Sequence, residues 1–117
     1  MAQVVALVDD LFFQAKLHET ARQVGVEVKT VTTGDALLAE AETHAPALLI
    51  VDLNARSGAI EALERLRAAG NQRPVVAFLS HVQVDLAERA RAAGCQQVMP
   101  RSKFTQNLAA ILSQAKS

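Results

Sequence analysis

A regular alternation of short apolar runs with longer helix-like segments is the feature that most constrains the fold of this chain. The apolar runs have the length of β-strands, and they occur at Val4–Val8, Val26–Thr32, Ala47–Val51, Val75–Leu79 and Gln97–Met99. The segments that follow them are rich in good helix formers, and they span Leu11–Val24, Gly34–His44, Ala59–Ala69, Val84–Ala93 and Phe104–Ala115. Such alternation predicts an α/β fold, because parallel strands are joined by helical crossovers that cover both faces of the sheet.

The character of the apolar runs predicts where each strand lies in the sheet. The runs at Ala47–Val51 and Val75–Leu79 are almost continuously apolar, as expected of strands covered on both faces. The run at Val26–Thr32 alternates with charged residues, and Pro100 directly follows the short run at Gln97–Met99. Both patterns are typical of edge strands. We therefore expect a single domain over residues 1–117 with a doubly wound, flavodoxin-like sheet of five parallel strands in the order 2-1-3-4-5, and five helices.

Composition narrows the classes of function. The chain has 12 Lys and Arg residues against 12 Asp and Glu residues, and this zero net charge argues against nucleic-acid binding. The sequence contains no apolar stretch long enough to span a membrane and no signal-peptide pattern. Its single cysteine, Cys95, cannot form an internal disulfide. We expect a cytoplasmic protein that binds neither nucleic acid nor membrane.

Acidic residues end two of the runs that should lie in the middle of the sheet. Asp9 and Asp10 close the stretch VVALVDD, and Asp52 closes the apolar part of LLIVDLN. In a doubly wound sheet of this order the ligand site lies beyond the carboxyl ends of strands 1 and 3. The three carboxylates should therefore face one another across one crevice. Carboxylates at such short separation repel one another and need a cation between them. Their hard oxygen atoms suit Mg²⁺.

The same edge of the sheet offers groups for phosphoryl chemistry. Asp52 is central, and its carboxylate could attack a phosphoryl group and become an aspartyl phosphate. Such a transfer needs positioning and charge neutralisation more than covalent chemistry from the protein. Ser80 ends the fourth run in VVAFLSH and can donate a hydroxyl to a phosphoryl oxygen, while Arg101 follows the fifth run in VMPRSKF and brings a positive charge.

On these residues the chain resembles a response-regulator receiver domain of bacterial two-component signalling, over essentially its whole length. The paired acids Asp9 and Asp10, the acid at Asp52 and the hydroxyl at Ser80 match the family's motif in order and spacing. The resemblance implies phosphotransfer to Asp52 from a histidine kinase or phosphotransfer protein. It also implies Mg²⁺ held by Asp10, Asp52 and the backbone carbonyl of Asn54, with Asp9 supporting the metal through water.

The sequence departs from the family's pattern at three places. The family carries a lysine after strand 5, where this chain has Arg101, and the two side chains are not interchangeable. The loop over residues 54–58 is short and lacks the family's customary proline, and Val98 stands where the family has its switch aromatic. These departures favour an alternative, a phosphorylation-independent pseudo-receiver that acts as a protein-interaction module.

Structural alternatives exist for several of these residues. Asp10 and Ser80 are residue types that cap helices, and Arg101 can neutralise the acids in an ion pair without any chemistry.

Of the adjacent Phe12 and Phe13, we expect one in the core and the other exposed near the acids.

The resemblance also bears on partners and on enzymatic activity. It implies a downstream protein target and a homodimer through the face made by helix 4, strand 5 and helix 5. We do not expect an enzyme beyond self-phosphotransfer on Asp52. Phosphatases with an aspartate nucleophile in a similar sheet require two acids that are two residues apart after strand 1. Here Asp9 and Asp10 are adjacent.

Overall fold

The computed structural model describes residues 3–55, 58–80 and 83–116, and it contains one parallel sheet of five strands in the order β2-β1-β3-β4-β5. The strands are β1 (Val4–Leu7), β2 (Val28–Val31), β3 (Leu48–Asp52), β4 (Val75–Leu79) and β5 (Gln97–Pro100). The predicted flavodoxin-like order and the edge positions of β2 and β5 are confirmed. The second strand starts two residues later than predicted, because the Val26 N–H donates to Ala21 O, 2.9 Å away, at the end of the preceding helix.

Helices connect all successive strands. They are α1 (Leu11–Val24), α2 (Gly34–His44), α3 (Ala59–Ala68) and α4 (Val84–Ala92), followed after β5 by α5 (Arg101–Gln106) and α6 (Leu108–Ser113). The last predicted helix thus begins earlier, at Arg101, and is divided at Asn107. The Asn107 side chain donates to Lys103 O at 2.9 Å, and such a bond competes with the regular helical ladder. None of the helices in the described ranges is long and apolar enough to cross a membrane.

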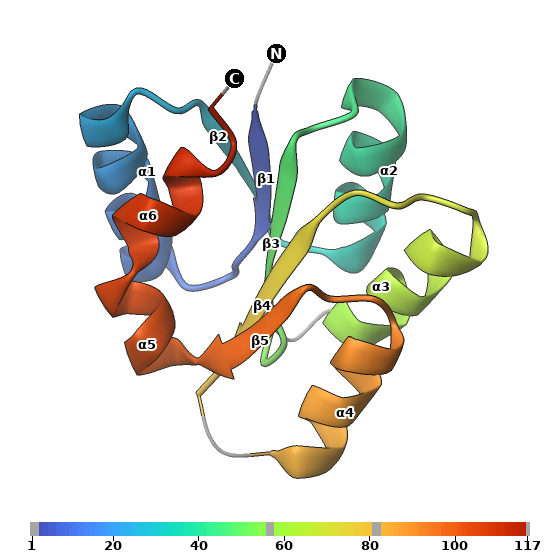
Figure 1. The fold of residues 1–117 in the computed structure, drawn as a ribbon. Helices are drawn as coiled ribbons and strands as arrows, with labels where there is room; N and C mark the ends of the chain where they lie inside the picture. Colours follow the sequence, from blue (N-terminus) through green and yellow to red (C-terminus); the bar gives the residue numbers. More distant parts are fainter. Residues whose placement is uncertain (1–2, 56–57, 81–82, 117) are drawn as a thin grey trace.

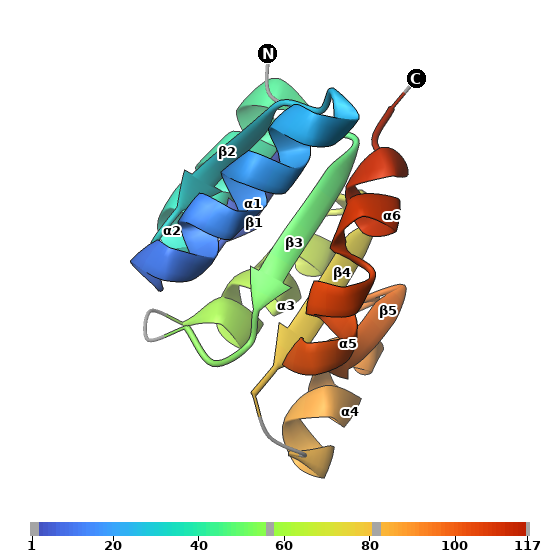
Figure 2. The same cartoon turned by 90° about the vertical axis from the view of Figure 1, so that its left-hand side faces the viewer.

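The helices form two layers on opposite faces of the sheet. Figures 1 and 2 show α1, α5 and α6 on one face and α2, α3 and α4 on the other. Successive residues of a strand point to opposite faces, so Val5 and Leu7 of β1 pack toward α2 and α3, whereas Val4 and Ala6 pack toward α1 and α6. Both faces of the central strands are therefore buried, and the functional groups gather at the carboxyl edge of the sheet.

Two features of this packing matter for the site. Asp52 is the last residue of β3 and only 5% exposed, and within the described residues it is the one polar side chain that is buried. Helix α4 is the most loosely packed of the long helices, because Ala90 is its one buried residue. The first residue of α4, Val84, is 60% exposed. The structure thus combines a rigid acidic position with a weakly held neighbouring helix.

Candidate functional site

Asp10 joins the end of β1 to the start of α1 and has both carboxylate oxygens engaged. Its Oδ1 accepts from the backbone N–H groups of Phe12 and Phe13, at 2.9 and 3.3 Å, which makes it the N-cap of α1. Its Oδ2 accepts from Arg101 Nη2 at 3.0 Å. The Phe13 hydrogen bond, followed by the bond from Arg101, lowers the pKa of Asp10 below its ordinary value. The helix cap and the ion pair that the sequence offered as alternatives are both present in this geometry.

Arg101 is the first residue of α5 and lies against an aromatic cluster. Its guanidinium carbon is 4.4 Å from the ring centroid of Phe13 and 5.9 Å from that of Phe78. These rings pack on each other and on Phe104, with centroid separations of 4.4 to 5.9 Å. A planar guanidinium stacks on an aromatic face in a way that a lysine ammonium cannot reproduce. The aromatic cluster therefore holds the Arg101 charge in place beside Asp10.

Asp52 lies at the centre of the charged edge. Its Oδ1 accepts from the backbone N–H of Asn54 at 2.9 Å. Burial is the main effect on this carboxyl and raises its pKa above the ordinary value; the Asn54 bond and the Arg101 charge lower the pKa, and the charges of Asp9 and Asp10 raise it. Asn54, Arg101, Asp9 and Asp10 all act on the Asp52 carboxyl. The structure therefore brings these residues, which follow three different strands, to the same edge of the sheet.

The donor chemistry of this edge suits a hard divalent cation, but the arrangement does not provide a ready cage. Carboxylate oxygens of Asp10 and Asp52 are the ligand type that Mg²⁺ prefers. Both oxygens of Asp10 already have protein donors, and one oxygen of Asp52 is bound to Asn54. Across the ranges that the structure describes, no group of three or more His, Cys, Asp or Glu side chains is placed to hold a metal ion. A divalent cation at Asp10 Oδ2 would therefore compete with the Arg101 guanidinium for the same carboxylate oxygen.

Ser80 and Asn54 are joined at the ends of β4 and β3. The Ser80 N–H donates to Asn54 Oδ1 at 2.6 Å, and Asn54 Nδ2 donates to Gln83 Oε1 at 2.7 Å. Helix α4 starts at Val84 after Gln83, so Ser80 is not its N-cap. The Ser80 side chain is exposed at the edge of the sheet, where a bound phosphoryl group could meet it. Arg56 and Ser57, in the short loop after Asp52, lie outside the described residues.

Sequence reasoning did not identify Gln83 as part of this site. The residue is an exposed amide with no motif around it, and only the folded chain shows that it contacts Asn54. The expectation for the two adjacent Phe residues is confirmed, because Phe13 is buried and Phe12 is 90% exposed. Leu11, which the sequence did not single out, is 76% exposed in the same turn of α1. Both exposed side chains directly follow Asp10 in the chain.

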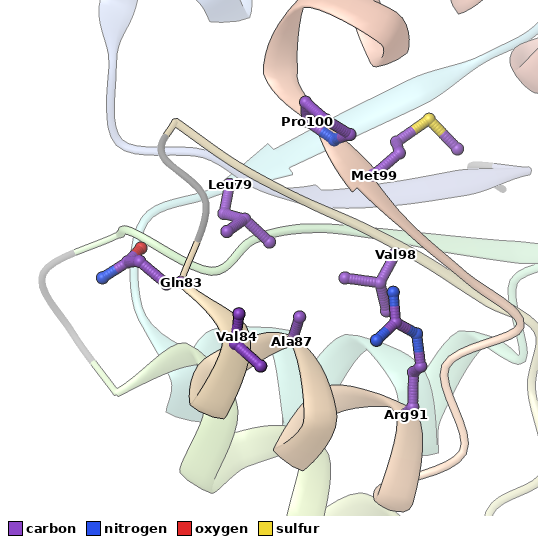
Figure 3. A pocket seen from close by; sticks show the side chains of 8 residues that line it. All are labelled: Leu79, Gln83, Val84, Ala87, Arg91, Val98, Met99 and Pro100. Carbon is purple, nitrogen blue, oxygen red and sulfur yellow. The ribbon is translucent and has the colours of Figure 1, made fainter.

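A hollow lies between α4 and β5, beside Val98. Its volume is about 210 Å³, and Val98 stands on its wall, half-buried (Figure 3). The remaining wall is mostly apolar and consists of Leu79, Gln83, Val84, Ala87, Arg91, Met99 and Pro100. The side chain of Val98 does not fill this space, so the start of α4 borders a hollow, while Leu86 and Ala87 of its first turn are partly buried against the core.

Comparison with known proteins adds a family match and several similar folds. A family model of the response regulator receiver domain matches residues 5–113. No curated protein sequence matches significantly. The chemotaxis response regulator CheY4 of Vibrio cholerae is similar with 21% identity, a TM-score of 0.81 and coverage of 99% of each chain. FixJ-N is similar with 22% identity, a TM-score of 0.82, and coverage of 98% of this chain and 93% of that chain.

One further solved structure is a dimer. It is the beryllofluoride-activated NtrC4 receiver domain, with 13% identity, a TM-score of 0.78, and coverage of 99% of this chain and 100% of that chain. At these low identities the solved structures show a shared fold.

Proposed function

The chain belongs to the response regulator receiver domain family, whose model covers residues 5–113, and on that premise we propose that it accepts a phosphoryl group on Asp52. The donor is the phosphohistidine of a histidine kinase or phosphotransfer protein in a two-component system. The observation that supports this most is the placement of Asp52, a buried carboxylate at the end of a central strand on which the charges of Asp9, Asp10 and Arg101 all act.

In the proposed transfer a carboxylate oxygen of Asp52 attacks phosphorus. An O–P bond forms while the P–N bond to the donor imidazole breaks, and the electron pair of that bond returns to the ring nitrogen. The reactive form of Asp52 is ionised. Burial opposes this form by raising the pKa of Asp52, and the Arg101 charge and the Asn54 N–H favour it. Arg101 and the Ser80 hydroxyl then interact with the phosphoryl oxygens.

Mg²⁺ is the cofactor that we propose for this reaction. When bound, it supplies positive charge for the phosphoryl oxygens. Asp10 and Asp52 would hold it, with Asp9 and the carbonyl of Asn54 as further oxygen donors. At Asp10 Oδ2 the metal would compete with the Arg101 guanidinium. We further propose that the protein works in the cytoplasm, passes its signal to a protein target, and has no catalytic activity beyond its own phosphotransfer.

The phosphorylation-independent pseudo-receiver remains the second candidate, because the Arg101–Asp10 ion pair specifically favours it. The pair neutralises Asp10 with a cation that belongs to the chain itself, at 3.0 Å. A domain built in this way can keep its fold and its partner surface without a metal or a phosphoryl group. A homodimer through the α4, β5 and α5 face fits both candidates; the NtrC4 receiver domain forms a dimer in its beryllofluoride-activated state.

Incubation with Mg²⁺ and acetyl phosphate separates the two candidates. We expect the intact mass of the protein to increase by one phosphoryl group, and the Asp52→Asn variant to gain none. Asp35→Asn is the matched control, because Asp35 is an exposed acid at the start of α2 whose carboxylate is paired with Arg65 and is not among the groups that act on Asp52. A wild-type protein that gains no phosphoryl group and gives no bound beryllofluoride signal in ¹⁹F NMR would favour the pseudo-receiver.

A further inference from the structure

Asn54 links Asp52 to Ser80 and Gln83, through its backbone on one side and its side chain on the other. Its backbone N–H holds Asp52 Oδ1 at 2.9 Å. Its side chain accepts from the Ser80 N–H at 2.6 Å and donates to Gln83 Oε1 at 2.7 Å. Any displacement of the Asn54 backbone by a group attached to Asp52 must therefore move or break its side-chain bonds to the segment before α4.

Gln83 in turn controls the start of α4. It occupies the N-cap position without a side-chain cap bond, and its carbonyl accepts the first helical hydrogen bond from the Ala87 N–H at 2.9 Å. Gln83 is also one of the residues that line the hollow between α4 and β5, with its side-chain amide pointing away from the other labelled side chains (Figure 3). The same residue thus contacts Asn54 with its side chain and fixes the first turn of the helix with its backbone.

The first turn of α4 is easily displaced, whereas the last turn is anchored. Val84 is 60% exposed and lies beside a hollow of about 210 Å³, and Leu86 and Ala87 of this turn are only partly buried, so less packing opposes a shift here than at the end of the helix. At the other end, the Arg67 guanidinium donates to Ala93 O and Gly94 O at 2.8 and 2.9 Å. A helix anchored at one end and loose at the other responds to a small force by pivoting at its loose end.

We infer that Gln83 is a positioning residue that couples the state of Asp52 to the first turn of α4 through the Asn54 side chain. The inference goes beyond the proposed function by naming how the signal leaves the acidic edge, and its first test rests on that function. By reciprocity, a change that fills the hollow must be felt at Asn54.

The first test uses beryllofluoride with Mg²⁺ as a phosphoryl mimic and follows backbone amides by ¹H–¹⁵N NMR. In the wild type, binding should shift the amide resonances of Val84 and Ala87. In Gln83→Ala the bound ¹⁹F signal should remain, while more than half of the shift at these two amides is lost. Gln83→Glu keeps an acceptor for Asn54 Nδ2 and should restore the shift. Full shifts in Gln83→Ala would overturn the inference.

Gln97→Ala is the matched control for this test. Gln97 is likewise an exposed amide, on β5, but it is not part of the wall of the hollow. This variant should behave as the wild type. A loss of shift in Gln97→Ala equal to that in Gln83→Ala would show that any amide truncation on this face disturbs α4, and would contradict a specific role for Gln83.

The second test needs no phosphoryl mimic, so it stands even if the proposed function fails. Val98→Phe places a ring in the hollow, and the Asn54 side-chain amide and Ser80 backbone amide should then shift. The shift should be absent when Gln83→Ala is added. Ala87→Val serves the same purpose if Val98→Phe does not fold. Unchanged Asn54 and Ser80 resonances in the filled variants overturn the coupling, whereas failure of wild type to bind beryllofluoride counts against the proposed function alone.

Discussion

Gly94→Ala should destabilise the protein far more than Gly70→Ala, although both glycines have the same backbone conformation. Their φ angles are +86° and +85°, a left-handed region that costs an alanine about 1 kcal/mol. A Cβ on Gly70 would meet no atom within 4 Å. A Cβ on Gly94 would lie 2.6 Å from Arg67 Nε. The two variants therefore share the backbone strain and differ only in what happens to Arg67.

The difference can be estimated from the bonds that Arg67 would lose. Its guanidinium donates to three carbonyl oxygens, those of Ala93, Asn71 and Gly94, at 2.8, 2.8 and 2.9 Å. The side chain can move away from a new Cβ only by giving up its bonds to Ala93 and Gly94. Charged hydrogen bonds are worth about 1.5–3 kcal/mol each when buried, and these are partly solvated, so we expect about 2 kcal/mol for the two. The expected losses in free energy of unfolding are then about 3 kcal/mol for Gly94→Ala and about 1 kcal/mol for Gly70→Ala.

Urea unfolding measures this difference directly. With a slope of about 1.5–2 kcal/mol/M, the two midpoints should lie about 1 M apart. Adding Arg67→Ala to Gly94→Ala should cost less than the sum of the single changes, because the bonds are lost only once. Equal midpoints for the two alanine variants, or additive losses in the double variant, would refute this account of how the end of α4 is anchored.

Three further predictions concern the titratable groups of the structure. Burial raises the pKa of Asp52 above its unfolded value of 3.8, so ionisation destabilises the fold as pH rises. Asp52→Asn should therefore be more stable than the wild type at neutral pH, with the gain vanishing below about pH 3.8 in pH-dependent urea titrations; a gain that persists in acid would contradict this cause. Arg101→Gln frees Asp10 Oδ2 from its ion pair and should bind Mg²⁺ several-fold more tightly by calorimetry, whereas unchanged affinity would show that Arg101 does not compete with the metal. Burial raises the pKa of the Cys95 thiol to about 11, so iodoacetamide should alkylate the native protein much more slowly than the urea-unfolded chain at pH 8, and equal rates would refute the burial.

The sheet and the gathering of the acids were predictable because they depend on patterns within single segments. Continuous apolar runs mark central strands, and an acid directly after such a run must lie at the carboxyl edge. The order of the strands and the shared electrostatics of Asp9, Asp10 and Asp52 follow from these two facts. The exposure of Phe12 and burial of Phe13 follow from their adjacency in the first turn of a helix that covers the sheet.

Other features depend on contacts between distant segments, which no local pattern reveals. The sequence identifies Arg101 as a cation near the acids, but its stacking on Phe13 and Phe78 appears only once α1, β4 and α5 have packed. The contact between Asn54 and Gln83 likewise joins two loops through exposed amides. The division of the last helix coincides with a side-chain bond from Asn107 to Lys103 O, in a segment whose helix propensity is otherwise continuous.

The stacking of Arg101 on the aromatic cluster has a consequence for any attempt to redesign this protein. A lysine introduced at position 101 would lose the stacking contact with the Phe13 ring. Its flexible side chain would place the ammonium group either near Asp10 or in solvent, without one fixed position. An engineered return to the common lysine would therefore have to reshape the rings beneath it as well. Arg101 and Phe13 form one packed unit here, and they would have to be exchanged together.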